Sequence, residues 1–151
     1  MKKLYFIGML SVLALCFTGC NGQGQNQPES ITGNVSQPVW TVSDTTDMTM
    51  SMTAVIKVDL ATRYPASAAD FALNANDLLG AFAGEKCLGK ASPQDGLFFL
   101  YVDGTEGAVT LRYYSAQYKN LFEAKDAFPF VNDSHLGTVA EPFTPAFTVV
   151  K

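Results

Sequence analysis

The sequence predicts an all-β domain, an antiparallel immunoglobulin-like β-sandwich of about seven to nine strands. Three observations predict it: one long segment alternates between apolar and polar residues, several other runs are short and apolar, and turn-forming residues separate them. Turns recur roughly every eight to twelve residues, which is typical of a sandwich, and a small closed barrel is the alternative architecture.

Residues 48–60 carry the clearest strand pattern. One face of an extended chain would hold only apolar side chains, namely Met48, Met50, Met52, Ala54, Ile56, Val58 and Leu60. The opposite face would hold Thr49, Ser51, Thr53, Lys57 and Asp59, with Val55 as the one exception. A period of two residues predicts a strand that buries one face, because no helical spacing places these apolar residues on one side.

After this strand comes a segment whose secondary structure the sequence does not decide, and then a predicted hairpin. Residues 61–76 mix Pro, Ala, Ser and Asn, so that a short helix and a loop are both compatible with them. Residues 77–84 and 85–92 predict two short strands, and residues 83–85 predict the tight turn between them. Gly80 and Gly89 inside these strands predict bulges or close backbone approach.

Residues 93–96 predict a turn, and the run that follows is the most apolar of the domain. Residues 97–102 are all apolar or aromatic, which predicts a central strand covered on both faces. Residues 108–114 alternate again, and residues 118–124 predict the next strand after a turn at 115–117. The last strands are expected at 128–131 and 147–150, in a region interrupted by Pro129, Pro142 and Pro145.

The N-terminus predicts export. Lys2 and Lys3 precede an apolar run over residues 4–17, and small residues follow it. This order is that of a signal peptide, and the run is shorter than the roughly 20 apolar residues of the alternative, a membrane-spanning helix.

Phe17-Thr18-Gly19-Cys20 resembles the lipobox of bacterial lipoproteins, with Phe17 in place of the usual Leu. The resemblance implies cleavage between Gly19 and Cys20 and attachment of lipid to Cys20. Two or more acyl chains anchor a protein stably, at ~0.8 kcal/mol per buried CH₂. Asn21 follows the cysteine rather than Asp, which by the same resemblance favours the outer membrane and leaves its periplasmic and surface faces both open.

Three regions follow from these patterns: a cleaved peptide at 1–19, a flexible tether at 20–37 rich in Gly, Asn, Gln and Ser, and a domain at 38–151. Cleavage removes two of the ten basic side chains and none of the fourteen acidic ones, which takes the formal net charge from −4 to −6. An acidic chain with dispersed Lys and Arg lacks the clustered basic residues that bind phosphate backbones, so nucleic acid is not an expected partner.

The domain also resembles a β-sandwich module of surface lipoproteins and secreted proteins from Bacteroidetes-type bacteria. The matching segments span most of residues 48–143 in order: 50–55, 77–82, 87–91, 98–100, 111–114 and 137–138 ahead of Glu141-Pro142. Such modules usually carry Arg where this chain has Leu88. The resemblance implies the sandwich fold, export and an accessory or adhesive role.

The residue types that carry catalysis are sparse. His135 is the sole histidine and lies in a polar segment expected to be a solvated loop. Cys87 is the one cysteine left after processing and lipidation, so no intramolecular disulfide can form and a buried thiol is expected. The acidic residues are spread singly over turns, and no metal-ligand or phosphate-loop spacing occurs. We therefore expect neither an enzyme nor a cofactor. Two alternatives stay open: a structural calcium held by loop carboxylates, and a hydrolase that uses two of the scattered acids.

Aromatic residues remain as candidates for ligand contact, since Trp40, Tyr113, Tyr114, Tyr118 and Phe122 could form a stacking platform for sugar rings. Alternation sends Tyr113 and Tyr114 to opposite faces, so that one is expected in the core and the other exposed. Tyr114 would share its face with Arg112 as an exposed pair, and cross-strand packing is the other interpretation of these residues.

The resulting expectation is a lipid-anchored, non-enzymatic protein of the cell envelope that binds a glycan or a protein. The alternative is a structural or adhesive subunit of a surface assembly, which would exchange the edges of the long alternating strand and of the C-terminal strand between protomers.

Overall fold

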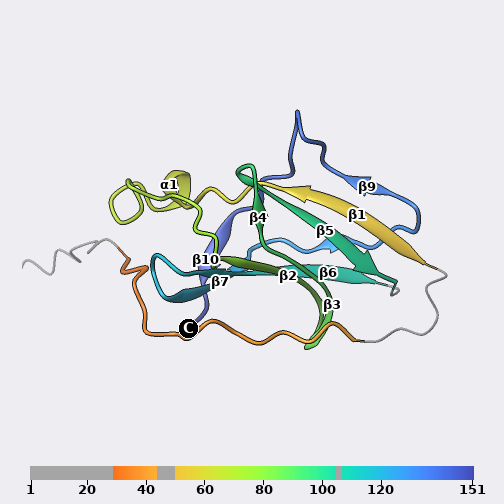
Figure 1. The fold of residues 1–151 in the computed structure, drawn as a ribbon, viewed down its shortest axis with the longest axis horizontal. Helices are drawn as coiled ribbons and strands as arrows, with labels where there is room; N and C mark the ends of the chain where they lie inside the picture. Colours follow the sequence, from red (N-terminus) through yellow and green to blue (C-terminus); the bar gives the residue numbers. More distant parts are fainter. Residues whose placement is uncertain (1–28, 44–49, 105–106) are drawn as a thin grey trace, which may run out of the picture.

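A computed structural model describes residues 29–43, 50–104 and 107–151, which form a two-layer β-sandwich (Figure 1). Ten strands and one short helix lie in these ranges. The strands divide between a four-stranded and a six-stranded sheet, which confirms the predicted sandwich rather than a single closed barrel. The predicted signal peptide, Cys20 and the first part of the tether lie outside the described residues.

The four-stranded sheet has the order β4 (Pro93–Gln94), β5 (Leu97–Asp103), β1 (Ser51–Ile56), β9 (His135–Leu136). β1 and β5 are antiparallel, and β9 pairs in parallel with β1. The loop expected around His135 therefore contains a short strand. That parallel pair is the one departure from antiparallel pairing among the named strands.

The six-stranded sheet has the order β10 (Phe147–Val149), β7 (Asn120–Ala124), β6 (Ala108–Ser115), β2 (Leu78–Ala83), β3 (Lys86–Ala91), and β8 (Phe128–Pro129) pairs with β6 beside this path. The hairpin predicted at 77–92 is confirmed as β2 and β3. Its turn contains Gly84, whose φ of 60° suits glycine.

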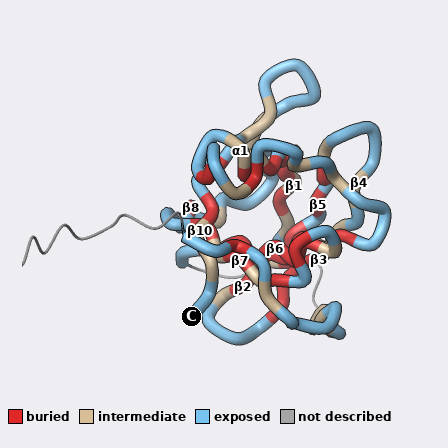
Figure 2. Tube along the Cα trace, turned by 90° about the vertical axis from the view of Figure 1, so that its left-hand side faces the viewer, coloured by how far each residue is buried: buried red, intermediate tan, exposed pale blue. Residues whose placement is uncertain are grey.

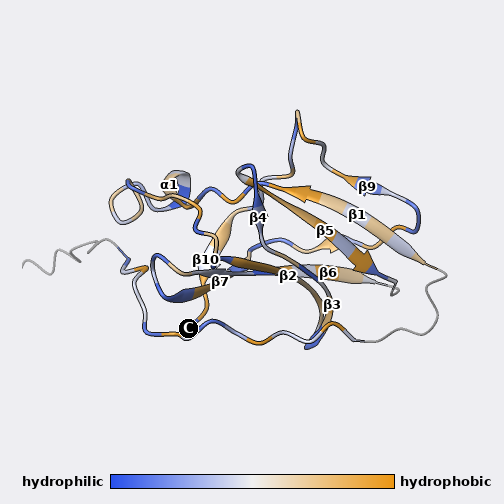
Figure 3. Ribbon diagram, viewed as in Figure 1, coloured by the Kyte–Doolittle hydropathy of each residue, from blue (hydrophilic) through white to orange (hydrophobic). Residues whose placement is uncertain are grey.

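The buried residues, red in Figure 2, lie on the facing sides of the two sheets, and their apolar side chains form one core cluster. The largest fully buried side chains are Tyr113, Phe98, Phe122, Phe147, Ile31, Ile56, Leu60, Leu79, Leu88, Leu111, Val102 and Val109. The alternation predicted for residues 48–60 is confirmed over β1, where Met52, Ala54 and Ile56 are buried while their neighbours are partly exposed. The strand is shorter than predicted, Met50 is 37% exposed, and residues 48–49 lie outside the described ranges. Figure 3 shows the apolar character of β2 and of the end of β1.

Two short elements differ in detail from the sequence expectation. Residues 60–63 form the four-residue helix α1 (Leu60–Arg63), and Asp59 caps it by accepting a hydrogen bond from the Thr62 backbone N–H at 3.0 Å. The turn predicted at 93–96 is narrower: Asp95 and Gly96, both with positive φ, connect β4 to β5 as a two-residue hairpin loop. No helix in the described ranges is long and apolar enough to span a bilayer.

The strap, which we define as residues 29–43, packs across the six-stranded sheet (orange in Figure 1). Its Gly33 and Val35 N–H groups donate to the carbonyls of Tyr118 and Lys119, and its Ser43 N–H donates to the carbonyl of Cys87. The sequence assigned residues 29–37 to the flexible tether, and for these residues that prediction is wrong. Ile31, 1% exposed, inserts into the core and fixes the strap at its start.

Candidate functional site

The predicted exposed pair, Arg112 and Tyr114, lies on the outer face of β6 under partial cover of the strap. Tyr113 and Tyr114 do point to opposite faces, yet both are buried, at 0% and 5% exposure. Tyr113 belongs to the core, and the Tyr114 hydroxyl donates to the carbonyl of Val35 at 3.3 Å. The expectation of one exposed tyrosine is therefore wrong, because the strap covers the face on which Tyr114 lies.

Arg112 is engaged by two carboxylates of its own sheet. Its Nη2 lies 2.9 Å from Glu85 Oε1, and its Nε lies 3.0 Å from Glu123 Oε2. The guanidinium also stacks over the Phe82 ring at 4.6 Å. The hydrogen bonds that Arg112 donates to Glu85, and to a smaller extent the one it donates to Glu123, raise the pKa of Arg112. These contacts make Arg112 a cross-strand connector.

The other members of the predicted aromatic platform are also packed inside the protein. Phe122 lies in the core and Tyr118 is buried at the end of the six-stranded sheet. Trp40 belongs to the strap, and its ring meets Phe82 edge-on at 5.2 Å between centroids. Cross-strand and strap packing, the other interpretation given above, accounts for this group.

Two aromatic side chains are exposed instead on β5, in the opposite sheet. Phe99 is 42% and Tyr101 is 49% exposed, while the intervening Leu100 is buried. The sequence predicted that this strand is covered on both faces, which is wrong. The run from Leu97 to Val102 is continuously apolar and hides the alternation, although the two aromatic rings do follow the period of two.

We call these two side chains, together with the cross-strand neighbours Val55 and Thr53, the β5 ledge. Val55 pairs with Phe99, and Thr53 pairs with Tyr101. On the far side of Thr53 lies His135, whose Nδ1 shares a hydrogen bond with the Thr53 hydroxyl. The ledge thus places two aromatic rings beside a hydroxyl and an imidazole, and it contains no Asp, Glu, Lys or Arg.

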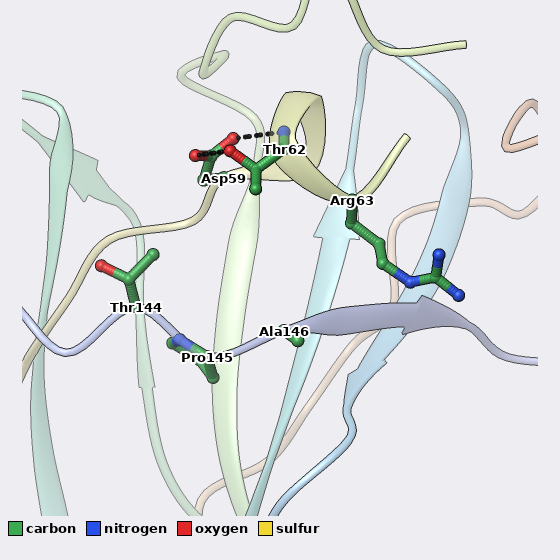
Figure 4. Close-up of a pocket in the computed structure, with 6 residues that line it drawn as sticks. All are labelled: Asp59, Thr62, Arg63, Thr144, Pro145 and Ala146. Carbon is green, nitrogen blue, oxygen red and sulfur yellow. Dashed lines mark hydrogen bonds between the residues drawn. The ribbon is translucent and has the colours of Figure 1, made fainter. Parts of the chain in front are cut away.

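A separate shallow hollow of about 210 Å³ lies between α1 and the segment leading into β10 (Figure 4). Its lining residues are Asp59, Thr62, Arg63, Thr144, Pro145 and Ala146. Asp59 accepts one hydrogen bond from the Thr62 hydroxyl and one from the Thr62 backbone N–H. Both lower the pKa of Asp59, and the bond from the hydroxyl has the larger effect. Asp59 is thus occupied as a helix cap, and Arg63 extends away from it along β10.

The catalytic candidates from the sequence are not assembled into a constellation. Cys87 is buried as expected, its thiol donates to the Gly89 carbonyl at 3.5 Å, and burial raises the pKa of this thiol. His135 lies in the other sheet, at the ledge. Within the described ranges, no group of three or more His, Cys, Asp or Glu side chains could hold a metal ion.

Comparison of the chain with family models, with curated proteins and with solved structures finds no match.

Proposed function

We propose that this protein is a lipid-anchored, non-enzymatic binding module of the cell envelope, and that the β5 ledge contacts its ligand. The observation that carries the proposal is the pair of half-exposed rings of Phe99 and Tyr101 on an otherwise well-buried strand. Leaving such rings in water forgoes burial free energy, so their exposure favours a partner that covers them.

The lipobox resemblance supports the anchor on Cys20. The strap shortens the predicted tether, because the packed region begins before Ile31. Residues 21–28 separate Cys20 from the strap, and eight residues span at most about 30 Å when fully extended. The anchor holds the sandwich close to the membrane, which in this proposal is the outer membrane, with the ledge on the sheet opposite to the strap.

The alternative, a structural or adhesive subunit that exchanges strand edges, depended on two particular strands. β1 is internal, between β5 and β9, and offers no edge. β10 is an edge strand of three residues, and its Val149 N–H donates to the Tyr64 hydroxyl at 3.1 Å. Neither strand has the long unpaired edge that strand exchange requires, so these contacts favour the binding role.

Metabolic labelling with an alkyne-bearing fatty acid tests the anchor. The full-length protein should incorporate the label, Cys20→Ser should lose it, and Cys87→Ala should retain it as the matched cysteine control. Label on the Cys20→Ser variant would contradict the anchor.

Hydroxyl-radical footprinting tests the ledge without knowledge of the ligand. Phe99 and Tyr101 should be modified less in intact cells than in the purified protein, whereas exposed Val139 should be modified equally in both. Equal modification of the two rings in cells and after purification would contradict a ligand at the ledge.

A further inference from the structure

We infer that the ligand of the β5 ledge is an uncharged oligosaccharide, an inference that rests on the function proposed above. The inference is carried by the shape, the spacing and the charge of the exposed face of β5 and by its neighbours on β1 and β9.

The two aromatic rings have the geometry of a stacking surface. Phe99 and Tyr101 lie two residues apart on one strand and point to the same side. That separation is on the order of 6.7 Å along the strand, so two successive sugar rings can each face one aromatic ring. Pyranose rings present C–H groups on their faces, and these pack against the apolar face of an aromatic side chain.

The polar neighbours are suited to the rim of such a ring. The hydroxyl groups of a sugar lie around its edge and need hydrogen-bonding partners beside the stacking surface. Thr53, paired with Tyr101, supplies a hydroxyl, and His135 supplies an imidazole hydrogen-bonded to it. Sites of this kind combine mostly apolar contact with a few placed polar groups.

The charge of the face selects for a neutral ligand. Phe99, Tyr101, Val55, Thr53 and His135 include no Asp, Glu, Lys or Arg. The same side of the two strands carries one charge of each sign just beyond them, on Asp103, which pairs with Ser51, and on Lys57, two residues after Val55. Arg112, the cation expected at a ligand site, is paired with Glu85 and Glu123 on the other sheet. A uronic acid or sulfated polymer would therefore find no cation among the ledge residues to offset its desolvation.

The two rings alone supply less apolar area than a standard protein interface buries. An aromatic side chain buries about 150–250 Å² at most, and Phe99 and Tyr101 are each about half exposed. Together they offer roughly 200 Å², against about 800 Å² from each partner in a standard protein interface. An oligosaccharide of a few sugar units needs no larger apolar surface than these two rings provide.

The test is a titration of the full lipidated protein in detergent micelles with cellohexaose, mannohexaose, galactohexaose and chitohexaose. At least one of these neutral probes should bind, and hexagalacturonic acid, the charged comparison, should bind more weakly. Phe99→Ala and Tyr101→Ala should each weaken binding about tenfold or more. Tyr101→Phe, which keeps the ring, should bind like the parent, and Val139→Ala is the matched control at a remote exposed position.

Because both rings are about half buried against β1, the two alanine variants should lose a little stability, whereas Tyr101→Phe and Val139→Ala should not. Urea denaturation that shows each variant folded under the titration conditions separates loss of binding from loss of fold. Failure of all four neutral probes to bind, tighter binding of hexagalacturonic acid, or full binding by the two alanine variants would each overturn the inference. So would dimerisation of the purified protein that Tyr101→Ala abolishes, because the ledge would then serve a second copy of the chain. If radical footprinting shows Phe99 and Tyr101 protected in cells but none of the sugars binds, the ligand is not a neutral oligosaccharide. The proposed function, a binding module that uses the ledge, would still hold.

Discussion

Gly89 of β3 lies directly against the backbone of Tyr101 in β5. A Cβ atom built on Gly89 would be 2.0 Å from the Tyr101 carbonyl oxygen and 3.1 Å from its carbonyl carbon. The two strands belong to different sheets, so that this glycine sets how closely the sheets approach at one side of the sandwich. Its absent side chain therefore determines the position of the backbone that carries one ring of the ledge.

Gly89→Ala should destabilise the protein by about 2 kcal/mol or more, because β5 has to shift to admit the methyl group. Urea denaturation followed by circular dichroism measures the change. Lys86→Ala, at an exposed position on the same strand, should stay within about 0.5 kcal/mol of the parent. A stable Gly89→Ala variant would show that the strands can separate at little cost.

A buried carboxylate anchors the end of the six-stranded sheet. Asp77 is fully buried, and its Oδ2 accepts hydrogen bonds from the Tyr113 hydroxyl at 2.7 Å and from the Asn74 N–H at 2.9 Å. Its Oδ1 accepts from the Ala116 N–H at 2.7 Å. These three bonds join the loop before β2 to the turn after β6.

Asp77→Asn should lower the free energy of unfolding by about 3 kcal/mol. Both carboxylate oxygens of Asp77 accept hydrogen bonds, and the amide NH₂ of Asn would place a donor where one of these acceptors now lies. Tyr113→Phe should cost roughly 1.5–3 kcal/mol, since it removes one hydrogen bond to a carboxylate and leaves the ring packing unchanged. Urea denaturation of both single variants and the double variant gives the coupling between them. Asp95→Asn, in an exposed turn where Asn tolerates positive φ, is the matched control and should be neutral.

The single tryptophan of the chain reports directly on the strap. The Trp40 ring lies over Gly80, where an added Cβ would come within 2.8 Å of the ring atom Cε3. Gly80→Ala should therefore displace the ring and raise the acrylamide quenching of its fluorescence, while the sandwich stays folded. Val39→Ala, at a 93% exposed position in the strap, should leave quenching unchanged. Equal quenching in all three proteins would mean that Gly80 does not seat the tryptophan.

The sequence predicted the strands well where one face is polar. Thr53 and its polar neighbours mark the outer side of β1, so alternation identified both the strand and its buried face. β5 offered no such contrast, because Phe99 and Tyr101 are as apolar in type as the residues facing the core. Periodicity in hydropathy cannot distinguish an exposed aromatic face from a buried one.

The strap was missed for a different reason. Its composition is polar on average, and one apolar residue, Ile31, together with backbone hydrogen bonds to Tyr118 and Lys119 holds its first part in place. Averages over a segment do not register a single buried anchor. The error at Tyr114 follows from the error at the strap. The parallel β1–β9 pair joins residues more than eighty positions apart over two residues, a contact that local patterns do not encode.

Alkaline pH should destabilise the protein through its buried tyrosines. Burial, followed by the hydrogen bond to Asp77 and by its charge, raises the pKa of Tyr113, and burial followed by the charge of Asp70 raises that of Tyr118. Unfolded tyrosine loses its proton near pH 10. Above about pH 10 the folded state thus holds more protons than the unfolded state, and the free energy of unfolding falls as pH rises through this range.

Tyr113→Phe should therefore be less stable than the parent at pH 7 and yet lose less stability between about pH 9 and pH 11. Urea denaturation at several pH values across this range measures both effects, and Tyr118→Phe should flatten the same slope by a smaller amount because Tyr118 is less deeply buried. If the parent and Tyr113→Phe lose stability in parallel, the alkaline loss has another source, since a phenylalanine has no proton to release and the only titrating group removed is the Tyr113 hydroxyl.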